Sequence, residues 1–246
     1  MPLNRALSKL GILSRAEATE AIRCGRVRVD GRVVRDPATL VPPEQVRIAI
    51  DGEERSRLAW RTILFHKPRG VVTTRRDPQG RRTVYDVIGP EAHGLVAVGR
   101  LDLATSGLLL LTSDTRLSGW ITDPANDVPR IYVLSVRGRV EEADLARLGG
   151  SVQHGPDRLH AHAAILRKAS GRESHLTIEL REGKNREVRR LFAAIGHEVT
   201  RLKRVRLGGL ELGSLEPGHW REVDASELKA AFPKATISAA VCSQVF

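Results

Sequence analysis

The sequence predicts an α+β protein made of a small N-terminal unit and a larger domain with a mixed, mostly antiparallel sheet. A length of 246 residues suits two domains, and a hydrophobic content of 41% is too high for a disordered chain. Residues 1–35 combine two amphipathic helical patterns with a β-hairpin signal. Beyond residue 61, short apolar strands outnumber helices and do not alternate with them, which argues against a doubly wound sheet.

Two helices are expected at the start of the N-terminal unit. The first follows from leucines at i, i+4 and i+7 spacing, and Gly11 ends it. These leucines are Leu3, Leu7 and Leu10. Ser14 and Glu17 have the spacing of a capping box and therefore begin the second helix, over residues 16–24.

A β-hairpin follows the helices. Asp30-Gly31 lies between two segments that alternate apolar and polar residues, 27–29 and 32–34, and Asp-Gly in this position is a strong hairpin signal. Residues 51–61 are polar without an apolar period, so we expect a linker there. The expected divisions are an N-terminal unit over 1–58, a second domain over 62–232 and a C-terminal tail over 233–246.

The second domain is predicted from short apolar and β-branched runs. The expected strands are 63–65 continuing to 71–74, then 95–98, 108–112, 131–136, 160–166, 174–180 and 199–207. The expected helices are 142–148, 185–195 and 226–232, with Asn185 as a plausible cap of the middle one.

The net charge of +11, from 40 Lys and Arg against 29 Asp and Glu, favours a polyanionic partner such as nucleic acid. An Arg-rich composition could also reflect the genome. The charge is, however, concentrated: residues 1–35 hold eight basic and three acidic side chains, and residues 181–206 hold nine and three. Within the first cluster, the expected phosphate contacts are Arg5, Arg15, Arg26 and Arg28.

Several protein classes are excluded by composition. The longest aliphatic run, Leu108 to Leu111, is far shorter than the roughly 20 residues of a membrane helix. Cys24 and Cys242 have neither metal-ligand spacing nor the number that a disulfide scaffold needs. We therefore expect a cytoplasmic protein with no metal site and no membrane partner.

The N-terminal pattern resembles the S4 RNA-binding domain. The resemblance rests on the leucine stripe, on Ser14-Arg15-x-Glu17-Ala18 and on Gly25-Arg26-Val27-x-Val29-Asp30-Gly31. It covers about the first 50 residues and implies binding to structured RNA. Because this domain accompanies many enzymes and ribosomal proteins, it does not name a reaction.

Three segments of the second domain differ from ordinary core. Asp102 follows an apolar strand in a polar loop, where the residues alone leave open a loop cap paired with Arg100 or a reactive carboxylate. Residues 182–196 form an apolar helical stripe flanked by arginines. Tyr132 begins a strand, and core packing is its more common role.

Together these segments resemble the ribosomal-RNA branch of the pseudouridine synthases that carries an S4 domain. The matching motifs are Gly-Arg-Leu-Asp-x2-Thr-Ser-Gly-Leu-Leu-Leu-Leu-Thr at 99–112, Lys-Pro-Arg-Gly-Val-Val at 67–72, Glu-Gly-Lys-Asn-Arg-Glu-Val-Arg-Arg at 182–190 and Leu-Lys-Arg-Val-Arg-Leu-Gly at 202–208. The resemblance spans residues 3–225. It implies isomerisation of uridine to pseudouridine without a cofactor, by a protein expected to be a monomer.

The resemblance also implies roles for individual residues. Asp102 is the essential nucleophile, which attacks the ribose C1′ or the uracil ring, or acts as a base towards a glycal intermediate. Arg189 pairs with Asp102, and Arg186 is a less favoured candidate for that pairing. Tyr132 stacks on the target uracil, and Leu202 forms an apolar wall for it. The expected phosphate contacts are Lys67, Arg100, Lys184 and Arg186.

One residue departs from the family pattern, which usually has Gln where this chain has Glu187. We expect Glu187 to point into solvent, screened by Arg186 and Arg190. The ending at 215–221 and the stretch 196–204 resemble the large-subunit group of the family more closely, which implies large-subunit (23S) ribosomal RNA as the substrate. The alternatives are the small-subunit (16S) RNA and a non-catalytic, RNA-binding ribosome-assembly factor.

Overall fold

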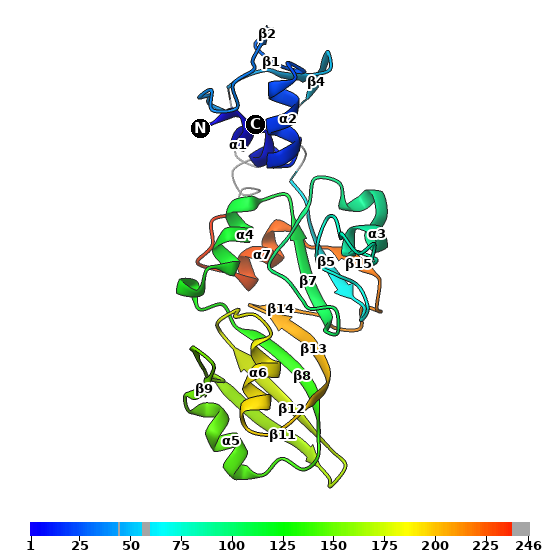
Figure 1. Ribbon diagram of the computed structural model, residues 1–246, viewed down its shortest axis with the longest axis vertical. Helices are drawn as coiled ribbons and strands as arrows, with labels where there is room; N and C mark the ends of the chain where they lie inside the picture. Colours follow the sequence, from blue (N-terminus) through cyan, green and yellow to red (C-terminus); the bar gives the residue numbers. More distant parts are fainter. Residues whose placement is uncertain (44, 56–59, 238–246) are drawn as a thin grey trace.

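The computed structural model describes residues 1–43, 45–55 and 60–237, and its N-terminal unit consists of two helices and a small sheet (Figure 1). The helices are α1 (Leu3–Lys9) and α2 (Arg15–Arg23). The antiparallel strands β1 (Val27–Val29), β2 (Arg32–Val33), β3 (Ile48–Ile50) and β4 (Glu53–Arg55) have the order β2-β1-β3-β4. Helices and sheet enclose one apolar core that includes Leu3, Leu7, Ile22 and Val27.

Local signals of the N-terminal unit are confirmed. Ser14 accepts a hydrogen bond from the Glu17 amide, and the Glu17 carboxylate accepts one from the Ser14 amide, so the capping box is complete. The hairpin turns at Asp30 and Gly31, which have φ angles of 48° and 81°, as a type I′ turn requires. The expected linker is wrong over residues 53–55, because Glu53–Arg55 adds an exposed, charged edge strand to the sheet.

A larger mixed sheet forms the second part of the described chain. Its nine strands have the order β11-β12-β8-β13-β7-β5-β15, with β14 against β13 and β6 against β7. Every pairing is antiparallel except that of β13 with β7, which confirms a mixed, mostly antiparallel sheet. The strands are β5 (Thr62–Lys67), β6 (Val96–Ala97), β7 (Ser106–Thr112), β8 (Arg130–Arg137), β11 (Ala163–Ala169), β12 (Glu173–Leu180), β13 (Val199–Leu207), β14 (Leu210–Glu211) and β15 (Trp220–Glu222).

Helices pack on both halves of this long sheet. Figure 1 shows α4 (Thr115–Thr122) and α7 (Ala225–Ala231) beside β7, and α5 (Glu142–Gly149) and α6 (Glu187–Ala194) beside the strands β8 to β13. Separate apolar cores lie under the two halves. The junction between the halves is the parallel contact of β7 with β13, where Lys203 pairs with Ser106 and Arg204 with Gly107.

Some elements differ from the expectation. Residues 71–74 form a single bridge, Val72 to Thr83, rather than a strand, and the strand expected at 95–98 is reduced to Val96–Ala97. Sequence analysis missed β15 and α4, and it also missed α3 (Val84–Ile88), β9 (Val152–His154) and β10 (Asp157–Leu159). The elements other than α4 have three to five residues, so few positions carry a periodic signal.

Two chain positions need separate correction. The helix expected at 185–195 covers Glu187–Ala194, and its cap is Arg186 in a left-handed conformation (φ 48°) rather than Asn185. The tail is not loose where it is described, since Ala235 and the buried Ile237 pack against the core of α4 and α7. Residues 238–246 lie outside the described residues. Within the described ranges, no helix is both long and apolar enough to cross a membrane.

Candidate active site

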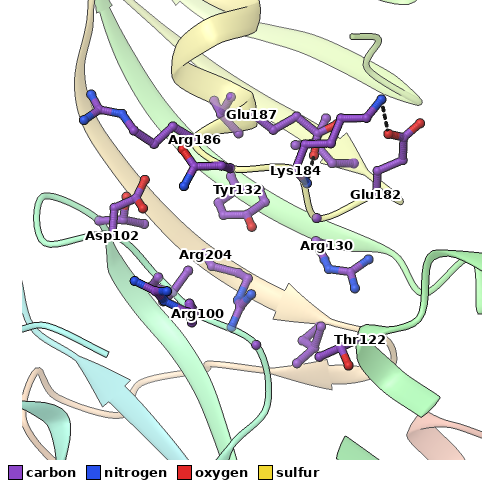
Figure 2. Close-up of a pocket in the computed structure, with 18 of the residues that line it drawn as sticks. Arg100, Asp102, Thr122, Arg130, Tyr132, Glu182, Lys184, Arg186, Glu187 and Arg204 are labelled. Atoms are coloured by element: carbon purple, nitrogen blue, oxygen red, sulfur yellow. Dashed lines mark hydrogen bonds and ion pairs between the residues drawn. The ribbon is translucent and has the colours of Figure 1, made fainter. Parts of the chain in front are cut away.

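A pocket of about 340 Å³ lies at the junction of the two sheet halves (Figure 2). Its lining comes from the loop before β7, from β8 and β13, and from the segment that joins β12 to α6. The charged lining residues are Arg100, Asp102, Arg130, Glu182, Lys184, Arg186, Glu187 and Arg204. Five cations therefore surround three carboxyl groups, which gives the pocket an excess of positive charge.

Asp102 is half-buried at one side of this pocket, on the loop between β6 and β7. Its main-chain carbonyl accepts hydrogen bonds from the Lys67 ammonium at 3.0 Å and from the Thr105 amide at 3.0 Å. Within the part of the chain that the structure describes, its carboxylate accepts no hydrogen bond and forms no ion pair within 4.0 Å. The backbone of this loop is therefore fixed while the carboxylate stays free to meet a ligand.

Lys67 is the main brace of the Asp102 loop. Its side chain is fully buried, and Nζ donates to the carbonyls of Pro68, Asp102 and Thr105 at 3.1, 3.0 and 2.7 Å. Burial lowers the pKa of Lys67 to about 8, and the nearby Asp102 opposes that shift. The expectation that Lys67 contacts phosphate is wrong, because all three of its donors are used inside the protein.

Two further contacts hold the same loop. The Thr73 hydroxyl donates to the Leu101 carbonyl at 2.9 Å and accepts from the Leu101 amide at 3.3 Å. The Gly70 amide donates to the Leu103 carbonyl at 2.8 Å. Residues just after β5 thus fasten the loop on both sides of Asp102.

Arg189 lies near Asp102 but does not form the direct pair that the resemblance implies. Its guanidinium donates to the carbonyl of Val199 at 2.6 Å and to that of Ala104 at 3.4 Å. Burial lowers the pKa of Arg189, and the charge of Asp102 acts in the opposite direction. Arg189 therefore links α6 to β13 and to the Asp102 loop, and its effect on the carboxylate is at longer range.

Tyr132 and Leu202 meet in the pocket from neighbouring strands. Tyr132 on β8 is half-buried and pairs in register with Arg204, and Leu202 on β13 is buried. Figure 2 shows the Tyr132 ring in the middle of the pocket, between Asp102 and Arg130. The structure therefore brings an aromatic ring and an aliphatic wall to the same cavity as the free carboxylate.

Cations line the rim of the pocket. Arg100 and Arg186 are exposed, and neither guanidinium has a partner among the described residues. Lys184 is engaged: its ammonium pairs with Glu182 at 2.5 Å and donates to the Arg158 carbonyl at 2.9 Å. Arg100 and Arg186 are thus immediately available to an anionic ligand, whereas Lys184 must first leave its partners.

Glu187 does not point into solvent, contrary to the expectation. Its side chain is 5% exposed and lines the pocket, and its carboxyl accepts a hydrogen bond from the Lys184 amide at 3.2 Å. Burial, with help from the charge of Glu182, raises the pKa of Glu187 to about 7. Arg190 does not screen it, because Arg190 pairs with Asp157 at 2.6 Å.

Among the lining residues that sequence analysis missed are Thr105, Arg130 and Arg204. All three are buried. Arg130 is the basic residue two positions before Tyr132, and Arg204 lies two positions after Leu202, so their spacing could have singled them out. Strand alternation places residues i and i+2 on one face of a sheet.

The arginines expected to bind RNA in the N-terminal unit differ in availability. Arg5, Arg15 and Arg28 are exposed, and Arg28 donates only to the Gly31 carbonyl. Arg26 instead forms a two-pronged pair with Asp51 at 2.7 and 2.5 Å. Three of the four are therefore accessible to phosphate.

The arrangement defines a class of protein. A basic unit of two helices and a small sheet precedes a domain whose pocket presents one free carboxylate, a tyrosine and several arginines. This combination defines an enzyme-like pocket in a basic protein, which suits a polyanionic substrate such as nucleic acid.

Comparison with known proteins gives the family. The family model described as RNA pseudouridylate synthase matches residues 61–194, and the S4 domain model matches residues 1–46. An uncharacterized RNA pseudouridine synthase of Aquifex aeolicus is 36% identical over 94% of this chain and 93% of its own length. The ribosomal large subunit pseudouridine synthase B of Escherichia coli is 37% identical over 92% of this chain and 80% of its own length.

Structural comparison agrees. A crystal structure of a pseudouridylate synthase superposes with a TM-score of 0.65 at 29% identity, covering 93% of this chain and 98% of that one. The chain therefore belongs to the RNA pseudouridine synthase family and is an isomerase that carries an N-terminal S4 domain.

Proposed function

We propose that this enzyme converts a specific uridine of large-subunit ribosomal RNA to pseudouridine, with Asp102 as the essential nucleophile. The observation that carries the proposal is the free carboxylate of Asp102 in the pocket. The backbone of its loop is held by hydrogen bonds from the side chains of Lys67 and Thr73 and from the Gly70 amide. The choice of the large subunit rests on relatives of that name from Escherichia coli and Yersinia pestis, which are 37% and 36% identical to this chain.

The reaction breaks the glycosidic bond, turns the base and forms a carbon–carbon bond, with no net oxidation or reduction. Asp102 supplies an oxygen that attacks the ribose C1′ or the uracil ring, or it removes a proton on the way to a glycal. In each route, preorganisation of the carboxylate lowers the barrier, because no structural rearrangement is needed when the substrate arrives.

The other pocket residues position the base. The target uridine must leave its stack to reach Asp102, at a cost of about a few kcal/mol that contacts in the pocket offset. Tyr132 supplies a stacking surface and Leu202 an apolar wall. Arg189 acts as a positioning residue for the Asp102 loop through its hydrogen bond to Ala104.

The proposal extends to the rest of the chain. Residues 1–58 form the RNA-binding unit, residues 62–232 the catalytic unit, and the enzyme works as a monomer in the cytoplasm without a cofactor. Exposed Arg5, Arg15 and Arg28 bind phosphates of folded RNA, and Arg100 and Arg186 bind phosphates close to the target.

Mapping pseudouridine in the host's ribosomal RNA tests this function. A strain without the gene is compared with the same strain carrying the wild-type gene or an Asp102→Asn gene, by carbodiimide treatment and primer extension. We expect one large-subunit position to lose its modification and only the wild-type gene to restore it. Loss of pseudouridine at a small-subunit position would contradict the proposed substrate. A pseudouridine map unchanged by loss of the gene would contradict the proposed function.

A further inference from the structure

Two buried arginines in the pocket have no acidic partner. Arg130 and Arg204 are 7% and 3% exposed, and neither forms an ion pair within 4.0 Å to any carboxylate among the described residues. Figure 2 shows both guanidinium groups among the lining residues, with Arg204 between Arg100 and Arg130 in this view. A buried charge is strongly unfavourable unless an opposite charge or several hydrogen bonds compensate it.

Arg130 is only partly compensated. Its guanidinium donates to the carbonyls of Val128, Arg181 and Ile121 at 2.8, 2.9 and 3.0 Å. Burial lowers the pKa of Arg130; Tyr132 acts against that shift, and the charge of Arg204 adds to it. The carboxyl of Glu187 also acts on the charge of Arg130 but forms no ion pair with it, and its Oε2 accepts a hydrogen bond from the Lys184 amide.

Arg204 is compensated even less. Its Nε donates to the Leu108 carbonyl at 2.8 Å, while Nη2 is buried without any partner. Gly107 allows this placement, because a β-carbon there would lie 2.1 Å from the Arg204 carbonyl oxygen and would push β13 away from β7. The fold thus brings Arg204 into the pocket without giving it a counter-ion.

A third polar group shares this situation. Thr105 is 2% exposed, and its hydroxyl oxygen is buried without a partner although Thr105 lines the same pocket. Buried polar groups are almost always hydrogen-bonded, and these two orphan atoms belong to residues that line one pocket, so a ligand bound there can complete both. Both can donate a hydrogen bond, which specifies an acceptor.

We propose that Arg130, Arg204 and Thr105 form a buried subsite for an anionic oxygen, which is a phosphodiester group of the RNA next to the target uridine. The source of the anion rests on the proposed function, whereas the subsite itself does not. Two buried cations that form no ion pair favour a full negative charge over a neutral carbonyl, because an anion compensates both of them. Arginine also matches phosphate by its forked geometry.

Binding of small nucleotides to the full-length protein tests the subsite. Uridine, uridine 3′-monophosphate, uridine 5′-monophosphate and inorganic phosphate are titrated separately and followed by NMR. We expect at least one monophosphate to bind ten-fold more tightly than uridine. In Arg204→Met, that monophosphate should bind at least ten-fold more weakly, while uridine affinity stays within two-fold.

Two further variants make the test specific. Arg206→Met removes the same charge two residues along β13, where Arg206 bonds the Gly208 carbonyl outside the pocket, and should bind all four probes as the wild type does. Thr105→Val removes a hydroxyl that has no partner, so it should leave the unfolding temperature unchanged or raise it. Thr105→Val should nevertheless weaken the binding of the monophosphate several-fold. This variant therefore tests the proposal even if Arg204→Met fails to fold.

The following outcomes would overturn the proposal. Equal affinities of the wild type for uridine and both monophosphates would show that no phosphate is bound. If Arg204→Met weakens the binding of uridine and of the monophosphate equally, Arg204 contacts the base and not the phosphate. If inorganic phosphate binds in an Arg204-dependent way but the monophosphates bind no more tightly than uridine, the subsite takes a free anion and not a phosphate of RNA. If the monophosphates bind as expected but no pseudouridine forms in RNA, only the proposed function fails.

Discussion

The Lys67 ammonium lies 3.0 Å from the main-chain carbonyl oxygen of Asp102 and contacts that residue through its backbone. Lys67 is fully buried at the end of β5, so it cannot leave this position to meet RNA. Its charge faces the loop that presents the carboxylate, and its three hydrogen bonds fix the loop's path. Lys67, which the family resemblance suggested as a phosphate contact, is therefore an internal brace of the site.

Removing this brace should slow the reaction more than it weakens RNA binding. Lys67→Met removes the hydrogen bonds from Lys67 to the carbonyls of Pro68, Asp102 and Thr105, although the Asp102 carbonyl keeps the Thr105 amide as a donor. This loss should destabilise the fold by about 1–3 kcal/mol. Displacement of Asp102 by about 1 Å should lower the single-turnover rate by about 100-fold. Lys168→Met, which removes an exposed lysine on β11, is the control and should behave as wild type in both assays. Full activity of Lys67→Met would contradict the bracing role.

Glu187 should make stability depend on pH. Because the pKa of Glu187 is about 7 in the folded protein and near 4.5 when exposed, the protonated form stabilises the fold. This contribution, roughly 3 kcal/mol, is fully present below pH 4.5 and is lost as pH rises through 7. Glu187→Gln should remove this dependence, so urea unfolding between pH 5 and 8 should give a flatter profile than wild type.

A neighbouring carboxylate controls for the general effect of pH. Glu198 is exposed and pairs with Arg137 at 3.4 Å, so Glu198→Gln should follow the wild-type profile. If Glu187→Gln also follows it, the carboxyl of Glu187 is not buried in the way described.

The junction of β7 with β13 should tolerate no side chain at position 107. Gly107 has φ 111° and faces the Arg204 backbone, so Gly107→Ala should destabilise the protein by about 3 kcal/mol or more. Gly119→Ala is the control, because Gly119 is exposed within α4 and a β-carbon there meets nothing within 4 Å. It should stabilise the protein by about 0.5–1 kcal/mol. Similar unfolding midpoints for both variants would contradict the close approach.

Exposed arginines of the N-terminal unit should contribute to the salt dependence of RNA binding. Arg5→Gln and Arg15→Gln should each reduce the log–log slope of affinity against salt by about 0.7–0.9 if each removes one phosphate contact. The measurement uses a transcript of large-subunit ribosomal RNA. Arg55→Gln, which breaks an exposed pair with Glu53, should leave the slope unchanged. An unaltered slope in all three variants would mean that this face is ordinary solvated surface.

Features that depend on neighbouring residues could be predicted from the sequence. The Ser14 capping box and the Asp30-Gly31 turn are determined by local hydrogen bonds and backbone preferences, and both are present as expected. The strands at 108–112 and 131–136 also form, because their apolar runs are long enough to show a strand signal.

The environments of Lys67 and Glu187 could not be predicted in the same way. All six residues of β5 are buried, so the polar alternation that would mark Lys67 as inward or outward is absent. Glu187 lies at the start of an amphipathic helix, where acids are common at the surface. Its burial depends on β8 and on the segment after β12, which are distant in sequence.

The direct pairing of Arg189 with Asp102 was expected from family resemblance, and the structure gives a different contact. The guanidinium bonds the carbonyl of Ala104, two residues away from the carboxylate. Spacing in a helix specifies the face that Arg189 occupies, but it does not specify which atom of the opposite loop it meets.

The central claim is that the Asp102 carboxylate performs the chemistry. Asp102→Asn removes the charge and keeps the size, and no hydrogen bond of the described structure involves that carboxylate. Pseudouridine formation in large-subunit ribosomal RNA should therefore fall below detection in a single-turnover assay, while RNA affinity and the unfolding midpoint stay within a few-fold and a few degrees of wild type. Pseudouridine formation by Asp102→Asn at a rate near that of wild type would contradict the account.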